Sequence, residues 1–494
     1  MPFSKQFWRP LAMGALAVAA SGALGVAHAQ KTADSKAGSV ARSQGAAASG
    51  PAKSSSASKE PRRGKKTKAT EAEKSTKNTQ DAKSSAARAA VPVAAVAPGA
   101  VAPGVAAPAA VHAGAEARLL KVIDLVQQQK LDMALQEASR LTLDVPHFQA
   151  AQLVYADLLR YKTGHAGALS PAPLPEVVAM RVKHTPQPST APGADSLEQL
   201  RGLQDEIKRR VQGANALPAT GSIPAEFLAL APSVRQAIAI DASKSRLYLF
   251  ANEDGKLRLT GDYYVSVGKL GMGKLEEGDQ RTPEGVYFIG RQIPGPKLPE
   301  FYGKGALTVN YPNDWDKAVG RSGSGIWLHG TPPDQFARLP LASDGCMVLS
   351  NTDLTHLMRT VGRLSPVLVR ERLHWVAAAD TGMGRERDAF FSVLHRWQQG
   401  WSQVDAQAAL SPLYQAEWRS SVAGQAMQER MANAFKGGAV LQDISAFAWK
   451  DSQGEIRIAN FRLKAKNQAE PLSLRQYWRK VGSEWKLFSE DTQN

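Results

Sequence analysis

Short apolar segments that alternate with polar residues fill the stretch from about residue 236 to residue 370. The segments, separated by turns rich in Gly, Pro, Asn and Asp, are 238–240, 247–249, 263–267, 286–289, 306–309, 326–328 and 366–369. Alternation with a period of two residues is typical of half-buried β-strands. We therefore predict a mostly-β domain over residues 233–372, built as a sandwich or a closed sheet. Asn351 or Thr352 is expected to cap one short helix, because the apolar residues that follow share one helical face.

A helical period of apolar residues marks residues 115–165, ahead of the β-rich stretch. Three stripes with spacings of three or four residues cover 119–126, 131–141 and 148–161, and Pro146 opens the third. The pattern predicts a small all-α segment of helical hairpins similar to tetratricopeptide repeats, although it has too few units for a free-standing solenoid. Two interpretations stay open: a bundle packed on a neighbouring domain, or a docking platform for another protein.

The last part of the chain, residues 385–494, has helical stripes first and strand patterns afterwards. Helical spacing occurs at 390–401 and 427–435, and strand-like segments follow at 440–449, 456–465, 473–481 and 485–488. This order predicts an α+β domain shaped like a cone. It resembles nuclear transport factor 2-like (SnoaL-like) domains, through Trp401 near Asp405, Tyr477-Trp478 and Trp485-Lys486-Leu487. The resemblance implies a module for substrate recognition or dimerisation, whereas the aromatic residues alone are more often simply core.

The first 29 residues have the pattern of a cleaved export signal. Lys5 and Arg9 give a positive start, residues 11–26 are apolar and small, and Ala27-His28-Ala29 provides a cleavage site. An uncleaved membrane anchor is the alternative, but the apolar run is short for a bilayer span. We expect an exported, periplasmic protein, so that a partner of the helical segment would be another envelope protein.

Two stretches lack the apolar residues needed for a core. Residues 30–114 are basic and then rich in Ala and Pro, and residues 166–232 are rich in Pro, with one expected helix at 196–211 that we interpret as a spacer. Such compositions predict a disordered tether and a second linker. The net charge is +16, and much of it lies in the tether, with a dense basic cluster at 62–68. A solvated linker explains that cluster, and electrostatic contact with anionic envelope polymers is the sharper alternative. Nucleic acid is not an expected partner of an exported chain, and the cluster has no interleaved aromatic residues.

The candidate chemistry centres on the single cysteine, Cys346. A lone thiol in an oxidising compartment is either a small buried apolar group or a reactive nucleophile. Cys346 follows a turn at residues 343–345, and His329 ends an apolar strand pattern just before Gly330. A thiol and an imidazole on neighbouring loops make a Cys/His pair, in which the histidine raises the thiolate fraction. The other histidines are scattered, so we predict no metal site and no cofactor.

The residues around this pair resemble the active-site signature of the L,D-transpeptidase (YkuD-type) catalytic domain. The signature segments are Ile326-Trp327-Leu328-His329-Gly330-Thr331 and Ser343-Asp344-Gly345-Cys346-Met347. Residues 278–285 and 306–312 look most like the Gram-negative branch of the family, and the resemblance covers residues 234–370. It implies a cysteine enzyme that acts on peptidoglycan stem peptides through a thioester.

The resemblance also implies a role for each residue of the signature. Cys346 is the nucleophile and His329 accepts and returns its proton, with the imidazole oriented by the backbone of Gly330. The N–H groups at the turn of Gly345 and Cys346 are the expected oxyanion donors. The residues expected to bind the substrate lie in the motif-bearing loops: Arg281, Thr282, Tyr302, Ser343 and Asp344.

Two positions depart from the family pattern. Asp344 stands where a second histidine is usual, and Val348 where arginine or asparagine usually follows. A carboxylate beside the nucleophile tends to raise the pKa of the thiol. Three functions therefore compete: a transpeptidase that joins stems, a hydrolase that trims stems or releases wall-anchored protein, and a non-catalytic scaffold that binds peptidoglycan. Because His329 is intact, we favour the transpeptidase.

Overall fold

The computed structural model describes residues 114–164, 194–436, 438–465 and 469–493. The expected export signal, the basic tether and the first part of the second linker lie outside the described residues. All described residues fall in one compact unit, Gly99–Asn494. In these ranges, no helix has the length and apolar character needed to cross a bilayer.

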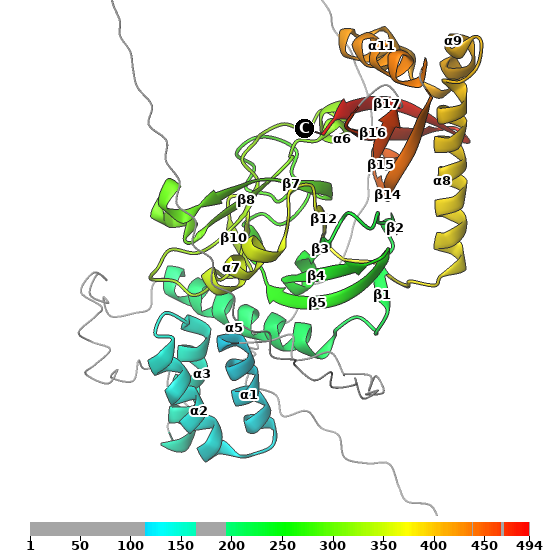
Figure 1. Cartoon of the computed structure of the whole chain (residues 1–494). Helices are drawn as coiled ribbons and strands as arrows, with labels where there is room; N and C mark the ends of the chain where they lie inside the picture. Colours follow the sequence, from blue (N-terminus) through cyan, green and yellow to red (C-terminus); the bar gives the residue numbers. More distant parts are fainter. Residues whose placement is uncertain (1–113, 165–193, 437, 466–468, 494) are drawn as a thin grey trace, which may run out of the picture. The chain divides into compact units, whose positions relative to one another are not determined.

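An eight-stranded sheet forms the centre of the β-rich stretch (Figure 1). Its strands are, in spatial order, β11 (Met347–Val348), β9 (Trp327–His329), β8 (Gly305–Val309), β7 (Gly285–Pro294), β12 (Pro366–Arg370), β3 (Gln236–Asp241), β4 (Arg246–Glu253) and β5 (Lys256–Tyr264). Neighbours are antiparallel except β11 with β9 and β12 with β3. A single bridge between Val348 and Ser266, just beyond β5, links the two ends of this order. The expected mostly-β domain is confirmed, as one sheet that curls toward closure.

Alternate residues of the strands supply two separate cores. On β3, Ile238 and Ile240 belong to one core, whereas Ala237 and Ala239 belong to the other, and all four are fully buried. This is the reason for the alternation in the sequence, because successive side chains of a strand point to opposite faces. The first core is covered by α7 (Asn351–Thr360), through residues such as Leu354 and Leu357.

The cap of α7 differs from the prediction. Ser350, not Asn351 or Thr352, is the N-cap, and its hydroxyl accepts a hydrogen bond from the Asp353 N–H at 3.1 Å. Asn351 instead joins two loops, since its side chain accepts from the Lys304 N–H and donates to the Thr331 carbonyl. Both distances are below 3 Å, at 2.9 and 2.8 Å. The position of α7 is thereby tied to the loop that follows His329.

The predicted helices ahead of the sheet are confirmed. They are α1 (Ala115–Gln127), α2 (Leu131–Asp144), α3 (Gln149–Lys162) and α5 (Ala194–Asn215). Ile207 of α5 shares a core with Leu119, Leu141 and Ala151 of the three earlier helices. The expectation that α5 is a solvated spacer is therefore wrong, because it is packed between the helical segment and the sheet. The likeness of α1–α3 to tetratricopeptide repeats stays a prediction.

A second sheet of five strands dominates the C-terminal part. Its spatial order is β17 (Glu484–Thr492), β16 (Leu472–Val481), β15 (Gly454–Ala465), β14 (Ala439–Asp451) and β2 (Phe227–Ala229). Helices α8 (Thr381–Gly400) and α11 (Val422–Lys436) pack on one face, in a core that contains Trp397 and Trp478. The α+β composition is confirmed, and the likeness to nuclear transport factor 2 stays a prediction.

Part of the second expected linker is incorporated into these sheets. β2 pairs with β14, and β1 (Ser222–Pro224) pairs with β13 (Trp375–Ala377). Both strands are only three residues long, which is too short for their alternation to be recognised in the sequence. The remaining regular elements of the described residues are β6 (Val267–Gly268), β10 (Leu341–Ser343), α6 (Asp314–Ala318), α9 (Ala406–Leu410), α10 (Ala416–Ser420), and four short 3-10 helices.

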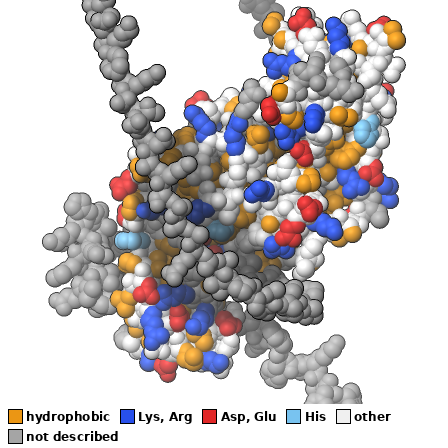
Figure 2. Space-filling model, in the orientation of Figure 1, with side chains coloured by type: hydrophobic (Ala, Val, Ile, Leu, Met, Phe, Trp, Pro, Cys, Tyr) orange, Lys and Arg blue, Asp and Glu red, His pale blue; other side chains and the backbone are white. Residues whose placement is uncertain are grey.

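Basic and acidic side chains are intermixed on the face of the molecule drawn in Figure 2, without a broad area of one sign. The basic cluster at residues 62–68 lies outside the described residues. Electrostatic contact between that cluster and anionic polymers therefore stays a prediction.

Candidate active site

A tight turn carries Cys346 between β10 and β11. Gly345 in this turn has φ +122°, and a Cβ there would lie 2.7 Å from the carbonyl oxygen of Arg281. Both features restrict the position to glycine, because L residues rarely adopt this conformation and no room is left for a side chain. The turn thus fixes the direction in which Cys346 emerges.

Two buried hydroxyl groups hold this turn. Ser343 accepts a hydrogen bond from the Gly345 N–H at 3.1 Å and donates one to the Cys346 carbonyl at 2.6 Å. Thr282 donates to the Gly345 carbonyl and accepts from the Gly268 N–H, both at 2.9 Å. Because both side chains are buried and their hydroxyls are engaged, they position the nucleophile here. Their expected role as direct substrate contacts finds no support in this geometry.

The two N–H groups of the turn differ in their availability to an oxyanion. The Gly345 N–H is bound by Ser343, so it is not free to serve as the expected donor. The Cys346 N–H makes no hydrogen bond to the part of the chain that the structure describes. It is therefore the donor that the turn offers to a developing negative charge.

Strand pairing brings Cys346 and His329 to the same region of the sheet. β11 runs parallel to β9, with Met347 opposite Leu328 and Val348 opposite His329. If this register is continued by one residue, Cys346 lies opposite Trp327. Because side chains alternate along a strand, Trp327 and His329 point to the same face, which is the face next to Cys346. In this structure the thiol donates a hydrogen bond to the Gly325 carbonyl at 3.4 Å instead of to the imidazole. Hydrogen bonds between catalytic groups are often long or poorly aligned before the substrate binds.

The imidazole of His329 is held in one tautomer. Its Nδ1 lies 2.7 Å from the carbonyl oxygen of Gly330, which can only accept, so Nδ1 carries the proton. The lone pair is then on Nε2, the atom a general base would use. The ring is buried, and this burial, with a contribution from the positive charge of Arg338, lowers its pKa to about 4 despite the bond to Gly330.

Aromatic rings enclose the imidazole. The ring of Tyr302 lies edge-on at 4.9 Å from that of His329, and Phe301 lies at 5.8 Å, measured between centroids. Trp327 packs on Tyr302 at 5.2 Å. The guanidinium of Arg338 covers the outer ring, 4.2 Å from the centroid of Phe301. This enclosure explains why water is excluded from His329. The expected contact of Tyr302 with substrate stays a prediction.

Cys346 keeps part of its surface exposed, yet protein surrounds the sulfur closely enough for burial to raise the pKa of the thiol. The Trp327 N–H and the charge of Arg338 oppose that shift, and Asp344 adds to it. At neutral pH the resting pair is therefore a neutral thiol beside a neutral imidazole. The sequence suggested that the histidine raises the thiolate fraction, whereas burial in this geometry favours the neutral thiol.

The carboxylate of Asp344 is exposed and directed to two neighbours. Lys269 forms an ion pair with it at 3.1 Å, and Gln280 donates a hydrogen bond at 3.2 Å. Its effect on the thiol is smaller than that of Arg338, which has the opposite sign. The replacement of the usual histidine by Asp344 thus leaves the nucleophile itself in place.

Arg281 belongs to a loop that is built around a carboxylate. Its guanidinium donates to the Met272 carbonyl at 2.9 Å, and its N–H donates to Asp279. Burial of Asp279 opposes ionisation, but hydrogen bonds from Lys274 and three backbone N–H groups lower its pKa to about 2. The Arg281 side chain thus fastens this loop, and its expected contact with the substrate stays a prediction.

Arg338 could not be recognised as part of the site from the sequence. The arginine is the cation that acts on both members of the pair, yet it lies in the irregular loop between β9 and β10, where no motif marks it. Only the folded chain brings it over Phe301 and toward Cys346.

His329 provides a pH-dependent contribution to stability. Between pH 6.5 and about 4 the His329 imidazole binds a proton in the unfolded chain but not in the folded chain. The free energy of unfolding therefore falls as the pH falls. Acidification from pH 7 to pH 4 should cost the parent about 3 kcal/mol more than His329→Gln, which does not titrate. Urea unfolding of both proteins at the two pH values measures the difference. If the parent and His329→Gln lose the same free energy of unfolding on acidification, the imidazole of His329 is not buried in its neutral form.

Part of the chain is similar to known proteins. Residues 235–369 match the model of the L,D-transpeptidase catalytic domain (YkuD). Bd1075 from Bdellovibrio bacteriovorus is similar in structure, with 24% identity and TM-score 0.45 over 55% of this chain and 98% of that chain. The helical cell shape determining protein Pgp2 from Campylobacter jejuni has 22% identity and TM-score 0.44, over 54% and 95% of the two chains. The L,D-transpeptidase from Mycobacterium smegmatis has 18% identity and TM-score 0.18, over 28% and 58%. No curated protein sequence matches the chain.

Proposed function

We propose that this chain is a cysteine L,D-transpeptidase that acts on the tetrapeptide stems of peptidoglycan. One observation supports the proposal. In a domain that matches this family, strand pairing brings the turn of Cys346 beside a histidine whose tautomer places the lone pair on Nε2. A nucleophile, a base and an orienting group for the base are the parts that acyl transfer requires. Cys346, His329 and Gly330 supply them in that order.

In the proposed reaction, Cys346 attacks the carbonyl of the third stem residue while its proton passes to Nε2 of His329. Because the pKa of the thiol is raised and that of the imidazole is lowered, proton transfer accompanies attack and does not precede it. The Cys346 N–H stabilises the resulting oxyanion. Collapse breaks the amide bond, the imidazolium returns its proton to the departing D-alanine, and a thioester remains. An amine of a second stem then attacks the thioester carbonyl, a new amide forms as the carbon–sulfur bond breaks, and the proton of the amine passes through His329 to the sulfur of Cys346.

Arg338 is expected to tune the nucleophile. Its positive charge lowers the pKa of Cys346, so Arg338→Gln should raise that pKa and slow alkylation of the thiol by iodoacetamide at pH 8 about two- to fivefold. The pH dependence of alkylation should move to higher pH in parallel. Arg291→Gln, which removes an exposed arginine on β7, is the matched control and should leave the profile unchanged. An unshifted profile for Arg338→Gln would show that this charge does not act on the sulfur.

The site of action that we propose is the periplasm, on the ground of the export signal expected at residues 1–29. Peptidoglycan stems would be reached there directly. The helical segment and the basic tether would then face other envelope components, as the sequence suggests.

Product analysis tests the function. The full chain would be incubated with purified muropeptides that carry tetrapeptide stems, and the products identified by mass spectrometry. Cross-linked dimers with loss of D-alanine support the transpeptidase. Trimmed monomers alone, or release of a wall-anchored protein, would assign the hydrolase, because water then replaces the amine. If the chain binds peptidoglycan but the masses of the muropeptides do not change, the protein is a non-catalytic scaffold.

A further inference from the structure

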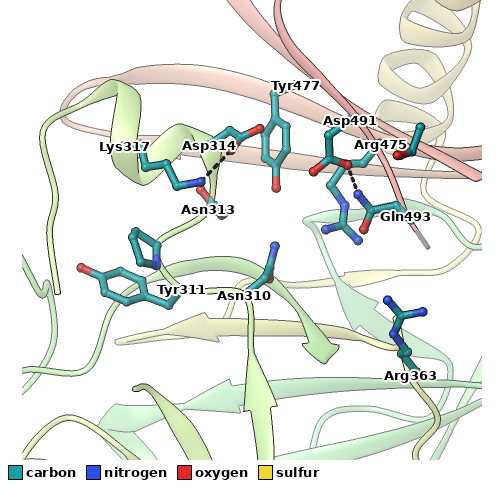
Figure 3. A pocket seen from close by; sticks show the side chains of 12 residues that line it. Asn310, Tyr311, Asn313, Asp314, Lys317, Arg363, Arg475, Tyr477, Asp491 and Gln493 are labelled. Atoms are coloured by element: carbon teal, nitrogen blue, oxygen red, sulfur yellow. Dashed lines mark hydrogen bonds and ion pairs between the residues drawn. The ribbon is translucent and has the colours of Figure 1, made fainter. Parts of the chain in front are cut away.

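A cavity of about 390 Å³ lies where the loop at residues 310–314 and helix α6 meet strands β16 and β17 (Figure 3). This volume is in the range of sites for small molecules. None of the residues placed at the thiol–imidazole site lines it. It is therefore a separate feature, formed by loops and helix α6 of the catalytic-like domain on one side and by strands β16 and β17 of the five-stranded sheet on the other.

Arg475 of β16 lines the cavity and is incompletely satisfied. Its side chain is 4% exposed, and its guanidinium lies 3.6 Å from the ring centroid of Phe288. Nε donates to Asn460 at 2.8 Å, and Nη2 is buried without a hydrogen-bond partner, while the charge of the guanidinium also interacts with Tyr477, Asp491 and Asp314. Because Arg475 lines the cavity, an acceptor of a bound ligand would meet a guanidinium whose hydrogen-bonding capacity is not fully used. Figure 3 shows the guanidinium extending into the space between Asn310 and Arg363.

Asn310 offers a second donor to the same space. Its side-chain oxygen accepts from the Phe288 N–H at 2.7 Å, which fixes the orientation of the amide. The amide nitrogen consequently points away from Phe288, and Figure 3 shows it directed toward Tyr477 and Arg475. Arg363 adds an exposed positive charge to the wall. The three donors together match a carboxylate, which can accept several hydrogen bonds.

Two carboxylates line the other part of the cavity. Asp314 pairs with Lys317 at 3.1 Å and accepts from Ser489, while Asp491 accepts from Gln493. A simple anion would meet repulsion from these two groups. A ligand that carries an ammonium next to its carboxylate satisfies both parts of the cavity at once.

We propose that this cavity binds the zwitterionic head of an amino acid. The carboxylate is held by Arg475 and Asn310, and the ammonium faces Asp491 and Asp314. The site lies apart from Cys346, so it adds a binding function that does not depend on the proposed enzymatic one.

Binding of glycine to the full chain tests the proposal, with acetate as the anion alone and methylammonium as the cation alone. Saturation-transfer NMR titrations would give the three affinities. We expect glycine to bind about tenfold more tightly than either half. Equal binding of acetate and glycine would overturn the zwitterion in favour of a plain anion site. Absence of glycine binding would show that Arg475 serves only the fold.

Asn310→Asp is the decisive variant. It keeps the oxygen that accepts from Phe288 and replaces the donating nitrogen by a negatively charged acceptor, so it should weaken glycine binding at least about tenfold. Lys464→Gln removes an exposed charge of β15 outside the cavity and should bind glycine as the parent does. Thermal unfolding of each variant checks that it is folded, which matters most if Arg475→Gln is also made. Unchanged glycine affinity in a folded Asn310→Asp would refute the assignment.

Discussion

Replacing Cys346 by alanine is expected to abolish acyl transfer from tetrapeptide stems, with a loss of roughly 10⁴-fold or more in turnover. The thioester cannot form without the sulfur. The loss should appear as unchanged tetrapeptide muropeptides where the parent releases D-alanine. Retention of dimer formation in the variant would place the chemistry elsewhere in the chain.

A second measurement separates loss of chemistry from loss of fold. Because the chain has one cysteine, a mass increase by one acyl group on the intact parent reports on Cys346 alone. Cys346→Ala should show no adduct and the thermal midpoint of a folded protein. Cys346→Ser keeps the shape of the side chain but not a thiol, so it serves as the matched control for packing. An adduct on the alanine variant would contradict the assignment.

The nucleophile and the base could be predicted from the sequence because each lies in a contiguous motif. Cys346 follows a glycine that its turn requires, and His329 ends a strand whose alternation is visible. The roles of the neighbouring residues could not be predicted in the same way. Ser343 and Thr282 lie in motif-bearing segments, but only the folded turn shows that their hydroxyls bind the backbone of Gly345.

The elements that were missed depend on contacts distant in the sequence. β2 is a three-residue strand whose partner in the sheet, β14, begins at Ala439. α5 was predicted as a helix but its packing was not, because its buried face carries Glu206 and Arg210 beside Ile207. Hydrophobic periodicity detects apolar faces, so a helix that buries an ion-pair network resembles a solvated spacer. A substitution in this ion-pair network is expected to lower the stability of the protein strongly.

Five buried charges join the helical segment to the eight-stranded sheet. Glu116 of α1 accepts from Arg210 of α5 at 2.9 Å and from Arg246 of β4 at 2.8 Å. Arg246 also contacts Asp262 of β5 at 2.6 Å, and Arg210 contacts Glu206 at 2.8 Å. Arg246 and Asp262 have no solvent exposure. Two arginines thus face three carboxylates, so the network tolerates the loss of a cation poorly.

Arg246→Met is expected to lower the free energy of unfolding by about 3–5 kcal/mol. The substitution leaves Asp262 and Glu116 buried with fewer positive partners, and it removes the link between α1 and β4. Urea unfolding measures the loss, and limited proteolysis should show earlier cleavage within α1–α3. The matched control is Arg258→Met, because Arg258 pairs with Glu253 on the surface, where both side chains are more than half exposed. That variant should cost less than about 1 kcal/mol.

A double variant distinguishes lost ion pairing from lost packing. Arg246→Met combined with Asp262→Leu removes both charges of the closest pair, and a buried pair replaced by apolar residues of similar size is often neutral in stability. The double variant should therefore recover much of the stability that Arg246→Met loses, while Glu116 keeps its contact with Arg210. If the double variant is less stable than Arg246→Met, the arginine acts through its packing against neighbours such as Gly213, where the side chain leaves no room for a Cβ. Recovery would show that electrostatic neutrality in the interior holds the helical segment on the sheet.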